Sequence, residues 1–280
     1  MNKKFIKKIW LEKFPIFLLD GIDNKKFLNG LTTSNMVQAE RNIIRTCWLN
    51  PKGVLKSLLE IHYVQNKLLI LILEGNVNEI RKHFEDIIFP ADKVEISNIK
   101  TNIRIQEVDD LYSWRKSQPI LLSENNCDDY IFKNSLSVMH PIDLKIWKIK
   151  QAIPTINFEI NGKNNPLELG LADLIDFKKG CFLGQEIMSK LKNASSLKQE
   201  IRVWKSNHPT NNLKLIDEKV YLENNSEKIV GYITRYTKIN AKEFIGLVMI
   251  KRNYLEDNNN FFSKQFGIIK LHRSIGSVFL

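Results

Sequence analysis

The residue of this chain best placed to do chemistry is a cysteine in a glycine-containing loop. Cys181 is the third residue of an octet at positions 179–186, Lys-Gly-Cys-Phe-Leu-Gly-Gln-Glu, just before a segment with helical periodicity. The unpaired N–H groups and the positive dipole end of a helix start favour a thiolate, and Lys178 and Lys179 favour it too. The octet therefore predicts a reactive thiol at Cys181, with an inert, buried cysteine as the alternative.

The other residues of the octet each allow a functional and a structural role. Gly180 and Gly184 would let the backbone approach a ligand closely, or would form ordinary loop turns. Gln185 and Glu186 open the predicted helix, where Glu186 would complement the helix dipole. Lys179 would lower the pKa of the thiol or bind an anion, unless it is simply a solvated lysine.

The cysteines and histidines form no motif of a disulfide or metal site. Cys47, Cys127 and Cys181 are far apart and odd in number, which argues against a disulfide framework and favours a reducing compartment. The sequence has no Cys-x-x-Cys pair and no metalloprotease-type histidine pair. We therefore expect the chain to build no zinc or iron-sulfur centre by itself.

The charge of the chain is strongly positive. A formal net charge of +11 indicates an anionic partner, such as RNA, an acidic protein or a polyanionic cofactor. The alternative is a solvated basic surface with no dedicated partner, because lysine, asparagine and isoleucine are overused together along the chain. The sequence shows no recognised RNA-binding motif or aromatic platform.

Neither a membrane span nor a signal peptide is expected. No apolar run approaches the roughly 20 residues that cross a bilayer. The apolar stretch after the lysine-rich first ten residues is interrupted by Glu12, Lys13, Pro15 and Asp20. A signal peptide needs an unbroken apolar segment and a small-residue cleavage site, so the expected location is the cytoplasm.

The segments that must position Cys181 alternate between strand-like and helical patterns. Apolar runs between turn residues predict strands at 14–19, 43–49, 54–64 and 68–73 and two more within 94–108. Helical spacing predicts a short helix that Asp23 caps, a second one that ends before Pro90, and helices at 142–152 and 185–192. Residues 109–129 are rich in turn formers.

The last third of the chain has a different pattern. Helical periodicity is absent, and short strands are expected at 201–205, 219–222, 228–236, 244–250 and 266–272. The whole chain is thus predicted to be α+β with antiparallel sheets, ending in a small barrel or sandwich. The expected domains are a bilobal region at 1–197, with lobes at about 1–93 and 94–197, and a C-terminal β-barrel at 198–280.

Residues 153–190 resemble the YgfZ-type folate-binding proteins, which are relatives of the glycine-cleavage aminomethyltransferase. The octet at 179–186 matches the Lys-Gly-Cys-aromatic-x-Gly-Gln-Glu signature of that family. Ile153-Pro154 and the stretch at 166–171, Pro-Leu-Glu-Leu-Gly-Leu, match its Ile-Pro and Pro-x-Glu segments in order and spacing. Weaker matches at 21–23, 27–30, 33–35, 49–53 and 231–234 extend the resemblance over nearly the whole chain.

The resemblance implies a bilobal region around a central folate channel, followed by a β-barrel. The implied ligand is tetrahydrofolate or a one-carbon folate derivative, whose polyglutamate tail would pair with the basic surface. Glu168 is the implied bidentate acceptor for the pterin N–H edge, with a charge at a helix start as the alternative. The full set of implied folate contacts is Glu168, Gly180, Gly184, Gln185, Glu186 and Asn35.

The chain also departs from the pattern of the family that it resembles. Lys56-Ser57 stands where the aminomethyltransferase carries an Asp-Asp pair, so the acid needed for aminomethyl transfer is missing. Lys150 falls near the position of a pterin-facing glutamate, and Asn35 replaces the usual aspartate of a Thr-x-Asp turn. Lys190 replaces a common arginine, and the glycine that follows this arginine in the family is absent from 193–196.

The leading interpretation is a folate-binding accessory protein for the assembly or repair of iron-sulfur enzymes, in which Cys181 is essential and Lys179 assists. Family members are associated with such maturation and with tRNA thiomethylation through iron-sulfur enzymes, so client or assembly proteins are the expected partners and tRNA an indirect one. The alternatives are a folate-dependent one-carbon transferase with an unknown acceptor and an RNA-binding protein acting in tRNA modification. The thiolate could attack a one-carbon unit, accept a sulfur species or ligate a cluster jointly with another protein.

Overall fold

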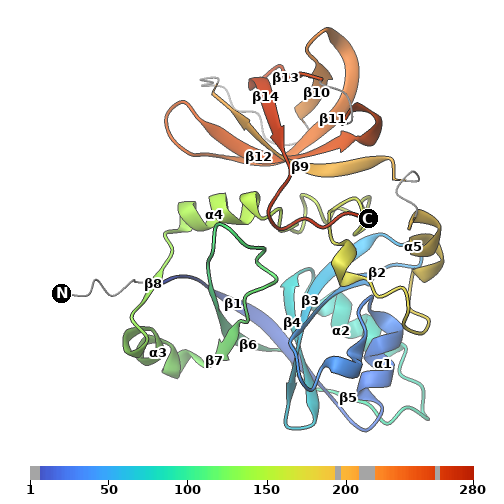
Figure 1. Cartoon of the computed structure of the whole chain (residues 1–280). Helices are drawn as coiled ribbons and strands as arrows, with labels where there is room; N and C mark the ends of the chain where they lie inside the picture. The colour runs from blue at the N-terminus through green and yellow to red at the C-terminus, as the bar shows by residue number, and fades with distance from the viewer. Residues whose placement is uncertain (1–6, 193–196, 208–217, 256–258) are drawn as a thin grey trace.

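The computed structural model describes residues 7–192, 197–207, 218–255 and 259–280. It has a mainly antiparallel sheet, in which one short strand at 136–138 pairs in parallel, with helices in its N-terminal part and a closed β-barrel in its C-terminal part (Figure 1). The predicted α+β class is therefore confirmed. None of the helices in these ranges is long and apolar enough to cross a membrane.

The large sheet is organised around its first strand, β1. Its strand order is β2-β3-β4-β1-β6-β7, and β5 and β8 also pair with β1. The strands are β1 (Lys7–Asp20), β2 (Ile44–Leu49), β3 (Leu55–Val64), β4 (Lys67–Glu74), β5 (Glu95–Ile96), β6 (Lys100–Glu107), β7 (Ile120–Leu122) and β8 (Leu136–Val138). Pro15 has no N–H to donate, and it lies just before the four residues Ile16–Leu19 that pair with β4.

Strand β1 joins the two predicted lobes in one sheet. Its first part pairs with β6, over Ile9 to Ile16, and its last part pairs with β4. In the sequence, β1 and β4 precede residue 93 and β6 follows it. The hydrogen bonds between β1 and β6 therefore cross the predicted lobe boundary. The division into lobes at 1–93 and 94–197 remains a prediction.

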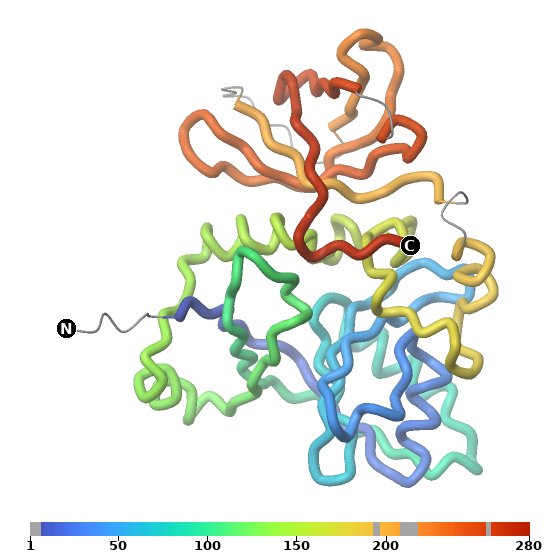
Figure 2. Tube along the Cα trace, in the orientation of Figure 1, coloured from blue at the N-terminus to red at the C-terminus, as the bar shows by residue number. Residues whose placement is uncertain are grey.

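Both faces of the sheet are covered. The helices are α1 (Asn24–Leu31), α2 (Val77–Asp86), α3 (Cys127–Lys133), α4 (Pro141–Lys150) and α5 (Gln185–Leu191). On one face, Phe17 and Ile70 of the sheet pack with Leu28 of α1 and Phe84 of α2. On the other face, Trp10 and Leu71 belong to a core that includes Trp147 of α4 and Ile201 of the barrel. Helix α4 lies between sheet and barrel in both views (Figures 1 and 2).

The barrel is closed by pairing between its early and late strands. Its order is β10-β11-β12-β9-β14-β13, and Trp204, Phe244 and Phe266 fill its interior. The strands are β9 (Gln199–Ser206), β10 (Glu218–Leu222), β11 (Asn225–Lys238), β12 (Phe244–Lys251), β13 (Phe261–Ser263) and β14 (Gly267–His272). After β14 the chain returns to the other part, where the N–H of Val278 donates to the carbonyl oxygen of Gly170 at 2.8 Å.

A buried charge cluster ties the sheet to the loop after β6. Arg104 donates two hydrogen bonds to the Glu60 carboxylate, at 3.0 and 2.9 Å, and Arg45 donates a third at 3.1 Å. Arg45 also donates to the carbonyl oxygens of Arg115 and Ser117. Burial alone would raise the pKa of Glu60, but Arg104, a hydrogen bond from His62 and Arg45 outweigh it, so the pKa lies below its ordinary value.

Most sequence-based elements agree with the structure, but β1 begins at Lys7, seven residues before the strand predicted at 14–19, and several short elements were missed. The turn-rich prediction for 109–129 missed β7 and the start of α3, and no strand was expected at β8 or β13. Asp23 is the N-cap residue of α1 as predicted, but its carboxylate makes no capping hydrogen bond and accepts from the N–H of Lys93 instead.

Candidate functional site

Lys179 fixes the start of the octet from inside the protein. Its side chain is buried, and its ammonium group donates to the carbonyl oxygens of Asn29 at 2.6 Å, of Ser34 at 2.9 Å and of Thr32. Burial lowers the pKa of Lys179 to about 8. The solvated-lysine alternative is thus wrong, and three acceptors already use the three N–H donors of the ammonium group.

The chain before and after Lys179 follows the same surface of α1. The N–H of Asp176 donates to the carbonyl oxygen of Thr33 at 2.9 Å. The hydroxyl of Thr33 donates to the carbonyl oxygen of Leu174 at 2.6 Å. The N–H of Leu183 donates to the carbonyl oxygen of Gly30 at 3.1 Å. The octet, the end of α1 and the turn at 33–35 therefore form one hydrogen-bonded unit.

Gly184 packs directly against the β2–β3 hairpin. It has a φ of +80°, and a Cβ there would lie 2.8 Å from the carbonyl oxygen of Asn50. Gly53 of the hairpin has a φ of +72°, and its Cβ would lie 2.8 Å from Cε of Met188 in α5. Gly184 thus requires glycine for its positive φ and for its contact with the main chain of the hairpin, whereas at Gly53 the positive φ alone favours glycine, because the Met188 side chain can move. At Gly180 a Cβ would meet nothing within 4 Å, so close approach of a ligand remains a prediction there.

Cys181 is the exposed cysteine of the three, whereas Cys47 and Cys127 are buried. The alternative of a buried Cys181 is therefore wrong, and the reactivity of the thiol stays a prediction. Helix α5 has seven residues and begins at Gln185, with Gly184 as its N-cap. This start is the predicted one, and Cys181 lies three residues before the N-cap, so support of the thiolate by the helix start stays a prediction. For comparison, burial raises the pKa of Cys47 to about 12.

Three other predicted folate ligands have local structural partners. The side-chain oxygen of Gln185 accepts from the N–H of Phe182 at 3.3 Å. Glu186 forms an exposed ion pair with Lys190 at 2.6 Å, four residues further along α5. The side-chain oxygen of Asn35 accepts from the N–H of Val37 at 3.0 Å and caps a short 3-10 turn. Their contact with a folate stays a prediction.

Glu168 lies at the junction between the sheet region and the barrel. It is buried, its carboxylate accepts from the N–H of Asn165 at 3.3 Å, and its carbonyl oxygen accepts from the N–H of Ile201 in β9. Burial raises the pKa of this carboxyl, and hydrogen bonds from Asn165 and Gln199 oppose the shift. The helix-start alternative is wrong, because no described helix begins within three residues of Glu168.

The β2–β3 hairpin contacts both predicted site regions. On one side Gly53 meets α5, and just beyond it the N–H of Leu55 donates to the carbonyl oxygen of Asn164 at 3.0 Å. The structure thus places the octet and the loop of Glu168 against one hairpin, although they share no hydrogen bond. Residues 193–196, where the resemblance breaks down, lie outside the described residues.

The two residues in place of the Asp-Asp pair have structural partners. Lys56 forms an ion pair with Glu79 of α2 at 2.6 Å. Ser57 is fully buried, and its hydroxyl donates to the carbonyl oxygen of Glu74 at 2.6 Å. Neither side chain supplies the missing carboxylate. Across the described ranges, no group of three or more His, Cys, Asp or Glu side chains could hold a metal ion.

Glu74 is a titratable group that no sequence pattern indicated, because its burial arises from packing against residues far along the chain. Its carboxylate accepts from the N–H of Ile156 at 3.1 Å. Burial raises the pKa of Glu74 from 4.5 to about 7, although this hydrogen bond, Lys148 and Arg235 lower it.

Glu74 is expected to make stability depend on pH. Its pKa is higher in the folded than in the unfolded chain, so the folded state binds more protons between pH 4.5 and 7 and loses stability as the pH rises through that window. Relative to wild type, Glu74→Gln should gain about 2 kcal/mol in free energy of unfolding between about pH 5 and pH 8, allowing for partial exposure. Urea unfolding at both pH values measures this gain, and a difference independent of pH would contradict it.

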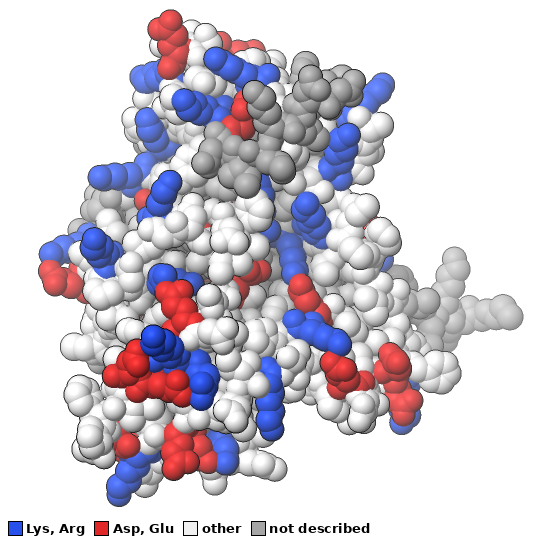
Figure 3. Space-filling model, turned by 180° about the vertical axis from the view of Figure 1, so that it is seen from behind, with Lys and Arg blue, Asp and Glu red and all other residues white. Residues whose placement is uncertain are grey.

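The basic side chains form no single cluster on the face opposite to the one in Figure 1. Lysine and arginine are spread over this side and are interspersed with acidic side chains, mainly in the lower part of the view (Figure 3). On this face, the charge of +11 does not produce a single continuous basic patch.

The chain is similar in sequence to curated proteins that share one name. No family model matches it. It is 25% identical over 295 residues to the tRNA-modifying protein YgfZ of Buchnera aphidicola subsp. Baizongia pistaciae, covering 91% of each chain. It is 23% identical over 209 residues to the protein of the same name from Aliivibrio fischeri, covering 65% of each. The chain is a YgfZ-type relative.

The solved structures support the same fold. The glycine cleavage system aminomethyltransferase T from Bartonella henselae superposes with a TM-score of 0.75 at 9% identity, over 97% of this chain and 86% of that chain. At this identity the likeness shows the fold alone. The aminomethyltransferase-like fold implied by the sequence resemblance is therefore confirmed for this YgfZ-type relative.

Proposed function

We propose that the protein is a cytoplasmic, folate-binding accessory protein for the assembly or repair of iron-sulfur enzymes, acting through Cys181. The observation that carries this proposal is the exposed thiol on a loop whose two ends are fixed. Lys179 holds one end through three carbonyl groups, and Gly184 holds the other against the hairpin. A thiol held in this way stays accessible to another protein while its backbone keeps one geometry.

In this proposal Lys179 positions the loop that carries Cys181. Its ammonium group is turned to the carbonyl oxygens of α1 and the following turn, so it acts on Cys181 by fixing the loop. The described residues offer Cys181 no cluster of further metal ligands. Ligation of an iron-sulfur cluster would therefore need ligands from a client or assembly protein, which fits an accessory role.

The names of the relatives support a link to tRNA modification. Two curated relatives are called tRNA-modifying proteins, and modification through iron-sulfur enzymes would connect that name with the thiol. Aminomethyl transfer is not favoured, because Lys56 and Ser57 are engaged with Glu79 and the main chain of Glu74. In this proposal tRNA is reached through the client enzymes.

Glu168 is the proposed acceptor for the pterin ring of tetrahydrofolate. A buried carboxylate with a raised pKa gains most from a ligand that presents two parallel N–H donors, because these donors stabilise its charged form. Glutamine at the same position keeps the shape but turns an N–H group toward those donors, so it should bind the pterin edge poorly.

Folate binding is expected to raise the melting temperature of the protein. Tetrahydrofolate at about 100 times its dissociation constant would add about 2.7 kcal/mol to the free energy of unfolding, a shift of roughly 5–10 °C for a protein of this size. Differential scanning fluorimetry measures the shift. Glu168→Gln should lose most of it, and Glu124→Gln, which alters an exposed ion pair with Lys13 outside the implied folate site, is the matched control that should keep it. A melting temperature that stays constant up to saturating folate would count against the folate proposal.

A further inference from the structure

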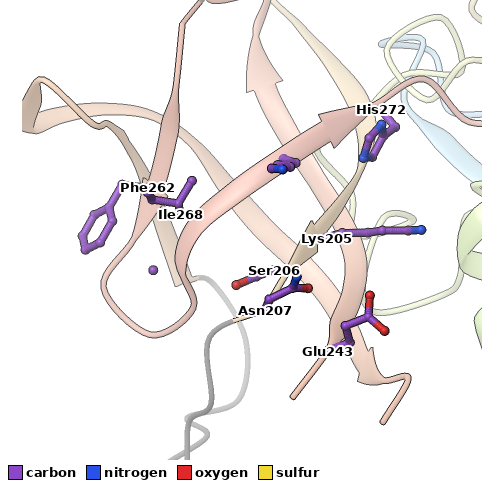
Figure 4. Close-up of a pocket in the computed structure, with 9 residues that line it drawn as sticks. Lys205, Ser206, Asn207, Glu243, Phe262, Ile268 and His272 are labelled. Atoms are coloured by element: carbon purple, nitrogen blue, oxygen red, sulfur yellow. The ribbon is translucent and has the colours of Figure 1, made fainter. Parts of the chain in front are cut away.

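A cavity of about 630 Å³ opens on the outer wall of the barrel, between β9 and β14 (Figure 4). Along β14, alternate residues point outward from the barrel, so Ile268, Lys270 and His272 lie in a row on its outer face and are exposed. Lys205 of β9 and Phe262 of β13 complete the row from the neighbouring strands. We call these five residues the β14 strip.

The basic end of the β14 strip is made by a pair of like charges. Lys270 and Lys205 are direct partners across the β14–β9 ladder. Like charges directly opposite one another destabilise a sheet, and no acidic side chain in the described ranges forms an ion pair with either lysine. The carboxylate that lines the cavity, that of Glu243, accepts a hydrogen bond from the side chain of Asn240 at 2.7 Å. An anion between the two lysines would relieve their repulsion.

The other end of the β14 strip is apolar and carries an aromatic ring. Phe262 and Ile268 are direct partners across the β13–β14 ladder, and Ile268 is 54% exposed. Both line the same cavity as the two lysines, at the opposite end of the row (Figure 4). The strip therefore offers, at its two ends, cations for a charged backbone and an aromatic ring for a planar base.

We propose that the β14 strip binds a single-stranded nucleic acid, with phosphate groups at Lys205, Lys270 and His272 and a base against Phe262. Proteins that bind single strands combine a basic groove with aromatic side chains on which bases stack. An acidic peptide would use the lysines but would gain little from the ring, so the combination favours nucleic acid. The inference goes beyond the proposed accessory function and does not depend on folate or on Cys181.

Binding of an oligouridylate of about 12 nucleotides tests the proposal. Fluorescence anisotropy with the full chain is measured at about 50 and 200 mM KCl, with the DNA oligonucleotide of the same length as a second arm. Wild type should bind the RNA in the micromolar range or tighter. Lys205→Gln/Lys270→Gln should weaken binding at least about tenfold and reduce the slope of log K against log salt by about 1.4, as expected for two lost phosphate contacts on a single strand.

Two further variants separate the β14 strip from general electrostatics. Lys82→Gln/Lys133→Gln removes the same charge from exposed positions on α2 and α3 and should change affinity less than about twofold. Phe262→Leu keeps an apolar side chain but removes the stacking ring, so it should weaken binding about fivefold with an unchanged salt slope. Thermal melts establish that each variant is folded.

Three outcomes would overturn the inference. Wild type could fail to bind either oligonucleotide at low salt. The two double variants could weaken binding equally, which would show diffuse attraction to the net positive charge. Polyglutamate of matched charge could bind as tightly as the RNA and respond equally to Phe262→Leu, which would make the strip a site for acidic peptides.

Discussion

Gly184→Ala is expected to lower the free energy of unfolding by about 3 kcal/mol. Alanine in the left-handed region at φ +80° costs about 1 kcal/mol, and its Cβ would lie 2.8 Å from the carbonyl oxygen of Asn50. The main chain fixes the position of the Cβ, and the carbonyl oxygen of Asn50 is itself a main-chain atom. Either the octet or the hairpin must therefore move. Urea unfolding at neutral pH measures the loss.

Gly180→Ala is the matched control four residues earlier in the same octet. Its Cβ would meet nothing within 4 Å, and Gly180 lacks the positive φ of Gly184. We expect a change within about 0.5 kcal/mol, as for most surface substitutions. If the two alanine variants were equally stable, the packing of the octet on the hairpin would be wrong.

The sequence located the chemistry of the octet better than its geometry. A cysteine between glycines beside lysines is a local pattern, and its exposure agrees with a reactive role. The partners of Lys179 lie about 150 positions earlier in the chain, as Asn29 shows, and no periodicity or spacing reveals such a contact. The predicted first residue of this helix, Gln185, agrees with the start of α5, where Gly184 in the left-handed region separates the loop from the helix.

Other features follow only from pairing between distant strands. The barrel strands were predicted from apolar runs, but β13 has three residues and is too short for a period-two pattern to stand out. The β14 strip depends on the register that places Lys270 opposite Lys205 and Ile268 opposite Phe262. For this reason the sequence showed positive charge without an aromatic platform, and only the ladder brings the ring into the cavity that the lysines line.

Cys181→Ala is expected to abolish function while leaving the protein folded. The side chain is exposed, so its loss should change the free energy of unfolding by less than about 0.5 kcal/mol. The folate-induced rise in melting temperature should persist, because Glu168 and its neighbours are unchanged. These two measurements separate the loss of the thiol from the loss of the fold or of the folate site.

The most direct test of the central claim is the activity of iron-sulfur enzymes in a host that lacks its own YgfZ-type gene and expresses this chain at matched levels. Wild type should restore the activity. Cys181→Ala and Cys181→Ser should both leave it at the level of the empty vector, since a hydroxyl replaces neither the nucleophilicity nor the metal affinity of a thiolate. Full restoration by the alanine variant would contradict the claim that the protein acts through Cys181.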